Sequence, residues 1–150
     1  MRNNIETEYL IFISSDGTKD AMDIFDERIK SNLWPIYEKT PQIINLKEGK
    51  KVIFYIAGNT KNSQHFIASA TIDKIIENSE LIIDPNQSLR LVKFYINFKN
   101  FLKFDKNVSV RENIDDLTFI KNKEKYGLYF QGGICKIDQT SYSYILNKAL

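Results

Sequence analysis

KVIFYIAGNTKNSQHFIASATI, residues 51–72, is the stretch that decides the fold class. It contains two apolar runs rich in β-branched and aromatic residues, Lys51–Ala57 and His65–Ile72, with the polar segment Gly58–Ser63 between them. Two such runs joined by a short polar segment are typical of a β-hairpin. We therefore expect two antiparallel strands here, in a protein whose sheet is built mainly by antiparallel pairing.

Strand-like patterns continue on both sides of this hairpin. Tyr9–Ser14 predicts a buried strand, Leu89–Phe98 alternates as a long strand does, and Ile134–Ile137 predicts a last short strand. We expect Phe101–Phe104 to carry apolar residues into a connection, whereas Asp73–Asn86 fits either a strand or a loop.

Three helices are expected, each preceded by a side chain that can accept a hydrogen bond from the first turn. The first helix runs from Ala21 to near Ser31–Asn32, with Thr18 as its expected cap. The second is Ile114–Ile120 with Asn113 as cap, and the third is Ser141–Ala149 with Asp138 as cap. The order of elements lacks a regular strand–helix alternation, and the chain has no repeat and no low-complexity linker. It predicts one α+β domain over residues 1–150, a curved or barrel-like sheet flanked by helices.

The composition excludes several kinds of site. Cys135 is the only cysteine, so an intrachain disulfide and a cysteine-based metal site are impossible. His65 is the only histidine and lies far from Cys135 in the sequence, so a catalytic Cys–His pair would require the fold to bring them together. Asp115–Asp116 could bind a divalent ion, but the dipole of the predicted helix explains the pair more simply. Close packing or a turn explains Gly132–Gly133. We expect no catalytic centre, no metal and no cofactor.

The sequence also carries information on location and charge. It lacks the pattern of a signal peptide and any apolar stretch of the roughly 18 residues that a membrane helix needs, so we expect a cytoplasmic protein. The formal net charge is only +2, but residues 90–125 contain more bases than acids. These bases could follow a nucleic-acid backbone or form an ordinary solvated face; they are Arg90, Lys93, Lys99, Lys103, Lys106, Arg111, Lys121, Lys123 and Lys125.

Trp34 is the only tryptophan, and Pro35 disfavours helical geometry at this position, which places Trp34 on the connection after the first helix. On composition alone, a position in the core explains Trp34 more simply than a role in binding does. However, Ser14, Ser15 and Asp16 follow the first strand and supply hydroxyls, a carboxylate and turn N–H groups. An aromatic wall beside such groups suits a planar heterocycle, because stacking supplies affinity and polar atoms choose among bases.

The order of several motifs is specific. Residues 115–150, DDLTFIKNKEKYGLYFQGGICKIDQTSYSYILNKAL, contain a DLxFIxNKxxYG pattern, a Gly-containing turn, a short strand and a helix. Earlier in the chain come YLIFISS at 9–15, Asn32–Leu33–Trp34, LKEGKKVIFY at 46–55, Gly58 and His65–Phe66. Together they resemble an EVE domain, a PUA-like family related to YTH domains. Lys50 replaces the Asp of the family pattern, and Tyr126 replaces its Trp.

The resemblance implies a small PUA-like β-barrel with helices around it, and nucleic-acid binding without catalysis. YTH domains hold an N6-methyladenine of RNA in an aromatic cage, and some EVE-like domains bind modified DNA bases flipped out of the duplex. Trp34 matches the cage Trp, Ser14 and Ser15 match the polar pair closing the first strand, and Asp16 follows them. With one Trp, a cage of three is impossible; the residues that could substitute are Tyr55, Tyr126 and Tyr129.

The leading hypothesis is therefore a non-enzymatic domain that recognises a modified base in DNA or RNA, with Trp34 stacking on the base. The other expected ligand residues are Ser14, Ser15, Asp16, Tyr55 and Tyr126, and the expected phosphate contacts are Lys121, Lys123, Lys125, Arg111 and Arg28. We expect a monomer, and a separately encoded nuclease or translocase partner fits this function. Two alternatives stay open: a small-molecule or protein-binding module on the same fold, and an enzyme, which the lone His and Cys disfavour.

Overall fold

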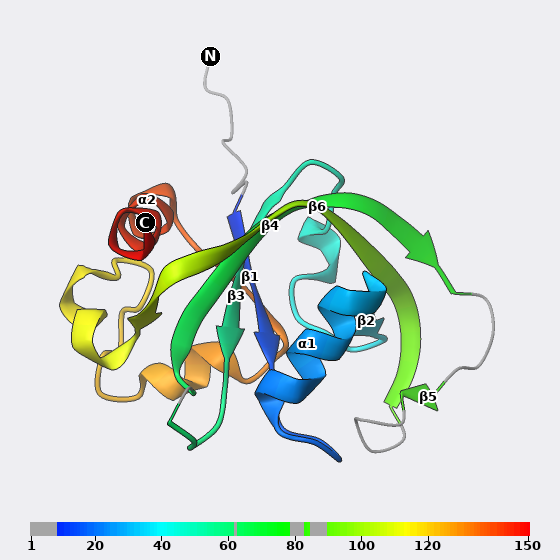
Figure 1. The fold of residues 1–150 in the computed structure, drawn as a ribbon, viewed down its shortest axis with the longest axis horizontal. Helices are drawn as coiled ribbons and strands as arrows, with labels where there is room; N and C mark the ends of the chain where they lie inside the picture. Colours follow the sequence, from blue (N-terminus) through cyan, green and yellow to red (C-terminus); the bar gives the residue numbers. More distant parts are fainter. Residues whose placement is uncertain (1–8, 62, 79–82, 85–89) are drawn as a thin grey trace.

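The computed structural model describes residues 9–61, 63–78, 83–84 and 90–150, and in them one curved sheet is flanked by helices (Figure 1). The strands are β1 (Tyr9–Ser14), β2 (Trp34–Tyr37), β3 (Lys51–Ile56), β4 (His65–Glu77), β5 (Ile83–Asp84), β6 (Arg90–Ser109) and β7 (Ile134–Lys136). The α-helices and 3-10 helices are α1 (Ala21–Ser31), η1 (Ile43–Asn45), η2 (Arg111–Asp116), η3 (Tyr126–Phe130) and α2 (Gln139–Ala149). The α+β prediction is confirmed.

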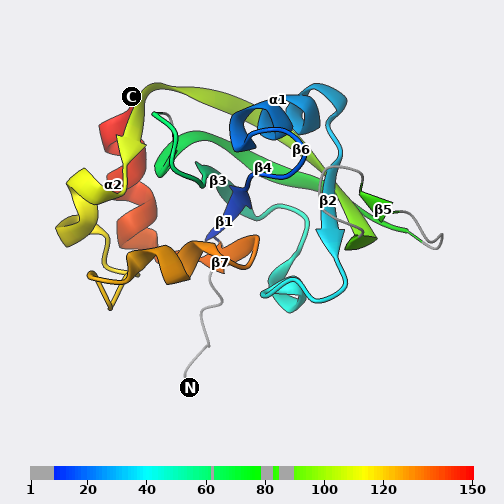
Figure 2. The same ribbon diagram turned by 90° about the horizontal axis from the view of Figure 1, so that it is seen from below.

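The sheet has the strand order β2-β6-β4-β3-β1-β7, and β5 pairs with β6 outside this path. β1 and β3 are parallel, and the other pairs are antiparallel. The predicted hairpin of β3 and β4 is confirmed, with Phe54 opposite Ala68. The sheet curls so that its edge strands, β2 and β7, border one pocket, although within the described residues they do not pair with each other (Figure 2). The barrel is therefore open along one seam.

The central strands β1 and β3 are buried on both faces. Leu10 and Phe12 of β1 belong to a core that includes Phe25 of α1, whereas Ile11 and Ile13 belong to a second core that includes Ile145 of α2. A strand covered on both faces needs apolar side chains at successive positions. This explains why the first strand is a continuous apolar run instead of an alternating one.

The ends of the two α-helices are set by local hydrogen bonds. The predicted cap Thr18 is wrong for α1: the Asp20 side chain accepts the Asp23 N–H at 2.9 Å, because Asp20 directly precedes the first turn. The helix ends as predicted, with Asn32 in the left-handed region at φ 54°. Asp138 caps α2 as predicted and accepts the Ser141 N–H at 2.7 Å, although the helix begins at Gln139.

The prediction of a connection at Phe101–Phe104 is wrong, because these residues lie within β6. β4 likewise continues to Glu77, so the first part of Asp73–Asn86 is strand, while residues 79–82 and 85–89, Leu89 included, lie outside the described part. The β4–β6 register shifts at three places, between Phe66 and Ala68 and twice further on. Such bulges bend and twist a strand pair, and they also disturb the alternation on which the sequence-based boundaries depended.

The predicted helix Ile114–Ile120 is also misplaced, since η2 spans Arg111–Asp116. Asn113 lies inside η2 with non-helical φ and ψ, and its side chain donates to the Ser109 carbonyl at 2.7 Å instead of capping a helix. Trp34 forms the start of β2, not a connection. Pro35 is tolerated there because β2 is an edge strand.

Gly132 lets the segment before β7 approach the segment after β2. A Cβ atom on Gly132 would lie 2.5 Å from Cγ of Pro41, so only glycine fits without a shift. The close-packing explanation of the Gly132–Gly133 pair is confirmed, and Gly133 adds a left-handed turn at φ 89°. This contact borders the seam between β2 and β7.

Candidate functional site

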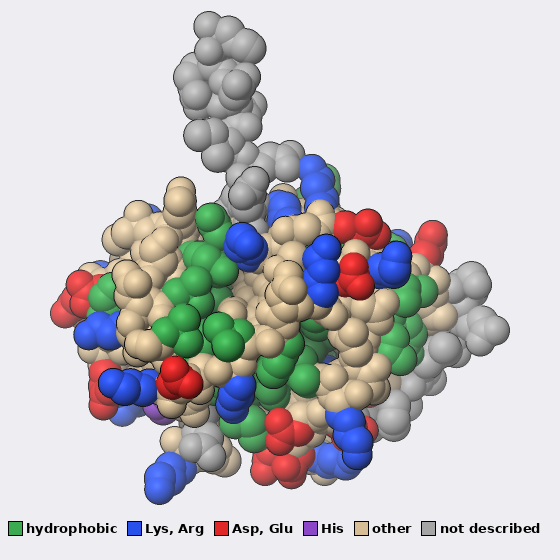
Figure 3. Space-filling view, turned by 45° about the horizontal axis from the view of Figure 1, so that its top comes forward, with side chains coloured by type: hydrophobic (Ala, Val, Ile, Leu, Met, Phe, Trp, Pro, Cys, Tyr) green, Lys and Arg blue, Asp and Glu red, His purple; other side chains and the backbone are tan. Residues whose placement is uncertain are grey.

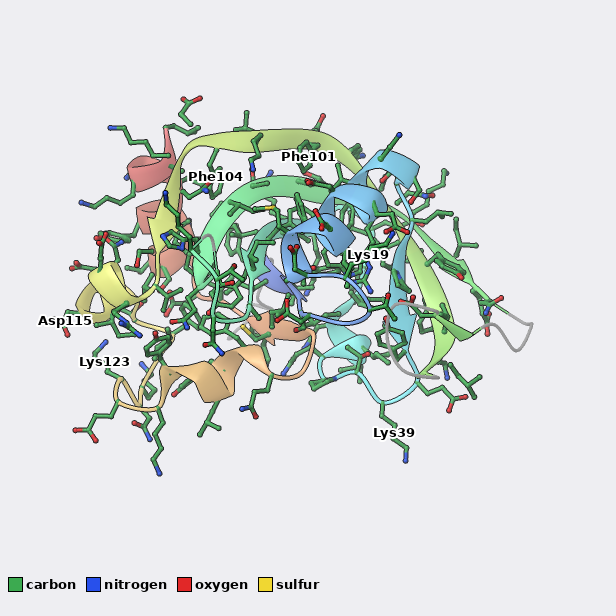
Figure 4. All side chains as sticks on the ribbon, turned by 60° about the horizontal axis from the view of Figure 1, so that its bottom comes forward. Lys19, Lys39, Phe101, Phe104, Asp115 and Lys123 are labelled. Atoms are coloured by element: carbon green, nitrogen blue, oxygen red, sulfur yellow. The ribbon has the colours of Figure 1, made fainter. Side chains whose placement is uncertain are left out.

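Two pockets meet just beyond the end of β1, and Ser15 and Gln131 line both of them. The seam pocket lies between β2 and the entry to β7 and is lined by Ile13, Ser15, Arg28, Trp34–Tyr37, Thr40 and Gln131–Ile134. The tyrosine pocket lies between the β3–β4 loop and η3 and is lined by Ser15, Tyr55, Ala57, Gly58, Gln64, Tyr126, Gly127, Phe130 and Gln131. Figure 4 views the molecule from this side, where the loop after β1 (blue), the β3–β4 loop (green) and η3 (orange) converge.

The two pockets differ in size. The cavity volume is about 50 Å³ in the seam pocket and about 370 Å³ in the tyrosine pocket. Small-molecule sites in proteins run from about 300 to 1,000 Å³. The tyrosine pocket therefore has the size of a ligand site, and the seam pocket is a narrow extension beside it.

A buried charged cluster stands at the seam pocket. Nη2 of Arg28 lies 3.1 Å from Oδ2 of Asp84 and donates to the Tyr37 hydroxyl at 3.1 Å, and that hydroxyl donates to the same Asp84 oxygen at 2.5 Å. Burial raises the pKa of Tyr37, so its hydroxyl stays protonated and can make this donation. Arg28 and Asp84 are both buried. Removing either partner of such a pair would leave an unpaired charge in the interior, which strongly destabilises a fold.

Trp34 is 2% exposed and packs among four phenylalanines: Phe12, Phe25, Phe54 and Phe98. The guanidinium carbon of Arg28 lies 5.0 Å from the Trp34 ring centre, and the ring centre of Phe54 lies 5.2 Å from it at 36°. A base could stack on Trp34 only after displacing one of these neighbours. Trp34 thus contributes to the seam pocket as a buried wall.

In the tyrosine pocket, the hydroxyl of Tyr126 donates to Oε1 of Gln64 at 2.5 Å, and Nε2 of Gln64 donates to the Gly58 carbonyl at 3.2 Å. Gln64 is held in the left-handed region at φ 61°, and its backbone N–H donates to the Ile56 carbonyl. Tyr55 is buried and stacks on Phe130 with ring centres 4.0 Å apart. Tyr126 is half-buried, so its ring is the aromatic wall that a ligand can reach.

The residues at and just after the end of β1 have separate roles. Ser14 is fully buried and its hydroxyl donates to the Ala21 carbonyl at 2.6 Å, which corrects its assignment to the ligand site. Asp16 is exposed and its Oδ1 accepts the Ala21 N–H at 2.8 Å, so it closes the turn into α1. Asp16 lines neither pocket, although a Cβ atom on Gly58 would come within 3.3 Å of its Oδ2. Ser15 is the member of the predicted trio that borders both pockets.

The predicted phosphate contacts differ in their surroundings. On the face drawn in Figure 3, Lys and Arg side chains are interspersed with acids. Arg28 is corrected: its guanidinium is buried against Asp84 and Trp34 and is not presented at the surface. Nζ of Lys123 donates to the Ile114 carbonyl at 2.8 Å, which ties it to η2, beside Asp115 in Figure 4. Lys121 and Lys125 are exposed just before η3, and Arg111 is exposed at the start of η2.

A Cys–His pair does not form. His65 is in β4 and Cys135 is in β7, with β3 and β1 between them, so three strand spacings of about 4.8 Å separate them. Burial also raises the pKa of Cys135 to about 12, which keeps it a thiol at neutral pH. Asp115 and Asp116 lie at the end of η2, not at a helix start, and Asp116 accepts from the Tyr144 hydroxyl at 3.2 Å.

Within the described ranges no cluster of His, Cys, Asp and Glu could hold a metal ion. Nor, over the same residues, does any helix combine the length and apolar character needed to cross a membrane.

The sequence analysis missed three polar lining residues, Tyr37, Gln64 and Gln131. It also missed Asp84, the ion-pair partner of Arg28. Only Gln64 carried a local signal, since it directly precedes the His65–Phe66 motif. The Arg28–Asp84 pair joins residues 56 positions apart, which no local pattern reveals.

No known family profile matches the sequence, and no curated protein is similar to it in sequence. Solved structures do match over nearly the whole chain. Human THYN1, solved in complex with 5-methylcytosine-containing DNA, superposes with a TM-score of 0.59 at 9% identity over 94% of this chain and 96% of its own. This protein has the PUA-like fold.

Two further structures share this PUA-like fold. The N-terminal domain of Staphylothermus marinus McrB matches with a TM-score of 0.52 at 13% identity and covers 98% of both chains. A hypothetical protein from Leishmania major matches with a TM-score of 0.59 at 17% identity, over 96% of this chain and 95% of that one. At these identities the likeness is one of fold, as the EVE resemblance implied.

Proposed function

We propose that this protein is a non-catalytic nucleic-acid-binding domain that recognises a base, flipped from its strand, in the tyrosine pocket. The fold it shares with THYN1, whose solved structure contains 5-methylcytosine DNA, and with the N-terminal domain of McrB supports nucleic acid as the partner. The observation that carries the proposal is the tyrosine pocket itself, with a reachable aromatic ring beside a fixed amide.

Tyr126 supplies the stacking wall. Stacking on an aromatic ring contributes about 1–3 kcal/mol per base and tolerates any base, because every base has a π-face. The hydrogen bond from Tyr126 to Gln64 fixes the hydroxyl end of the ring, and the half-buried state leaves part of the ring open. The wall is therefore in place before a ligand arrives.

Gln64 supplies the edge contacts. A primary amide has two N–H groups and two oxygen lone pairs, and the bonds with Tyr126 and Gly58 use one of each. One donor and one acceptor of the same amide are left. That arrangement matches the adjacent donor and acceptor on the edge of a base that has left its stack.

The seam pocket lies next to the base. At about 50 Å³ it has room for one or two water molecules, which take roughly 30 Å³ each in the liquid, and not for a base. Since Ser15 and Gln131 border both pockets, a small substituent on the base edge could reach this polar extension. We assign discrimination between modified and plain bases to this junction.

The proposal is tested by fluorescence anisotropy with labelled 12-nucleotide DNA and RNA, plain or carrying one 5-methylcytosine or N6-methyladenine. Each is used single- and double-stranded and at two salt concentrations. We expect binding that weakens steeply with salt and at least one modified oligonucleotide preferred over its plain counterpart. Binding to none of them would contradict nucleic-acid recognition. A ligand bound with no salt dependence would favour the small-molecule or protein-binding alternative.

A further inference from the structure

A third pocket, which we call the His65 pocket, opens on the other side of Gln64. Its cavity volume is about 330 Å³, and it lies between the β3–β4 loop and the start of η2. Its lining includes Asn59, Thr60, Gln64, His65, Ser109 and Arg111. These side chains are all polar and none is acidic.

Backbone hydrogen bonds hold the two sides of this pocket together. His65 is opposite Ile56 of β3 and Ser109 of β6, so it sits in the middle of three paired strands. The Val110 N–H donates to the Gln64 carbonyl at 3.1 Å, which places Arg111 next to the loop. The backbones of His65 and Arg111 are therefore held close to each other.

The His65 ring has a defined orientation. Its Nδ1 lies 2.6 Å from the Ser63 carbonyl oxygen, and because a carbonyl only accepts, Nδ1 must carry the hydrogen. Nε2 is then the ring nitrogen that this contact leaves unused. The contact with Ser63 thus aims the imidazole.

Arg111 differs from Arg28 in its environment. Arg28 is buried against Asp84, whereas Arg111 is exposed, and within the described part of the chain no acidic side chain forms an ion pair with it. An exposed guanidinium beside an imidazole and hydroxyl groups suits a phosphate, whose oxygens accept two parallel hydrogen bonds from the planar fork. Lys103 of β6 offers a comparison, because it is exposed yet lines none of the three pockets.

We propose that the His65 pocket binds a phosphodiester group of the nucleic-acid strand, next to the nucleotide whose base occupies the tyrosine pocket. The inference rests on the proposed function, since Gln64 lines both pockets and would lie between base and phosphate. Arg111 binds the phosphate irrespective of the base, with His65 in the pocket wall beside it, so this pocket sets affinity and register while the tyrosine pocket sets selectivity.

The test uses a 12-nucleotide single strand of thymidines with one central 5-methylcytosine. A second set carries an uncharged methylphosphonate in place of the phosphate on either side of that base. Proteins compared are the wild type, Arg111→Ala and the matched control Lys103→Ala. Because the chain has one histidine, its imidazole signals in NMR spectra report on His65 without ambiguity.

We expect the oligonucleotide to shift the His65 signals and Arg111→Ala to weaken binding roughly tenfold, as loss of a charge-assisted hydrogen bond does. In Arg111→Ala the slope of log K against log salt should flatten by about 0.7. Lys103→Ala should have smaller effects on both the affinity and this slope. One methylphosphonate should weaken binding of the wild type and not of Arg111→Ala. The ratio of modified to plain affinity should persist in Arg111→Ala.

Binding without a His65 shift, or an Arg111→Ala variant indistinguishable from Lys103→Ala, would overturn the phosphate site and leave the base pocket standing. If no oligonucleotide bound at all, the proposed function would fail. A titration with inorganic phosphate then decides on the pocket alone: a saturable His65 shift that Arg111→Ala abolishes supports anion binding, and its absence overturns it.

Discussion

The guanidinium of Arg28 in α1 lies over the ring of Trp34 in β2, with its carbon 5.0 Å from the ring centre. A cation over a tryptophan face is attracted by the ring quadrupole, most strongly when both are removed from water. The same guanidinium reaches Asp84 of β5. One buried side chain therefore joins the first helix to two strands, β2 and β5.

Replacing Asp84 should destabilise the fold. Asp84→Asn keeps the shape but leaves Arg28 buried without its counter-charge, which costs about 3–5 kcal/mol in comparable buried pairs. Urea unfolding followed by circular dichroism measures this loss. Glu27→Gln is the control, because it breaks an exposed pair with Lys19 and should change stability little. Equal losses of stability in the two variants would show that the Arg28–Asp84 pair contributes no more than an exposed ion pair.

Removing the ring of Tyr126 should weaken nucleic-acid binding. Tyr126→Ala takes away the stacking wall, so an affinity loss of about 1–3 kcal/mol, roughly 5- to 150-fold, is expected. Tyr126→Phe keeps the ring and loses only the bond to Gln64, and should retain most of the affinity. Leu128→Ala, also on η3 but 59% exposed and outside the pocket lining, controls for local disturbance. Wild-type affinity in Tyr126→Ala would exclude the ring as the wall; anisotropy measures all three.

Gly132→Ala should be destabilising by about 1–3 kcal/mol, the usual cost of overpacking. Its new Cβ atom would meet Cγ of Pro41 at 2.5 Å. Gly127→Ala is a matched control, because a Cβ atom there meets nothing within 4 Å, and its effect should stay within about 0.5 kcal/mol. Thermal unfolding of the two variants checks the difference, and similar midpoints would contradict the tight Gly132–Pro41 contact.

The cap of α2 should give a stability contribution that depends on pH. Burial acts to raise the pKa of Asp138, but hydrogen bonds from Ser141 and Thr118 outweigh it and hold that pKa below its usual value. A depressed carboxyl pKa stabilises the fold above the unfolded-state pKa, and this stabilisation is lost as pH falls through the folded-state pKa.

Asp138→Ala should therefore cost about 1 kcal/mol at neutral pH, as loss of a helix cap does, and the gap to the wild type should shrink in acid. Asp138→Asn keeps an accepting oxygen and should retain much of the cap without this pH dependence. Urea unfolding from pH 7 to about pH 2.5 measures both variants. A gap that stays constant over this range would exclude titration of Asp138 as its source.

Local sequence determined the elements whose causes are local. Tyr9–Ser14 is apolar at nearly every position because a central strand is covered on both faces, and Asp138 caps α2 because its carboxylate reaches an N–H three residues on. Such interactions span a few residues, so the pattern that causes them is visible in the chain itself. The PUA-like fold was predicted from the resemblance in motifs, whereas the order of elements along the chain does not give the strand order β2-β6-β4-β3-β1-β7.

Tertiary structure decided what depends on residues far apart. β4 and β6 continue past their alternating segments through three shifts of register, and the curled sheet places β2 and β7 at a common seam. Trp34 became a buried wall because Arg28 and Phe54 cover it, and Arg28 left the surface because Asp84 meets it there. The sequence identified Trp34 and Arg28 as candidates for binding. Their burial and their partners depend on neighbours that are distant in the sequence and come together only in the folded chain.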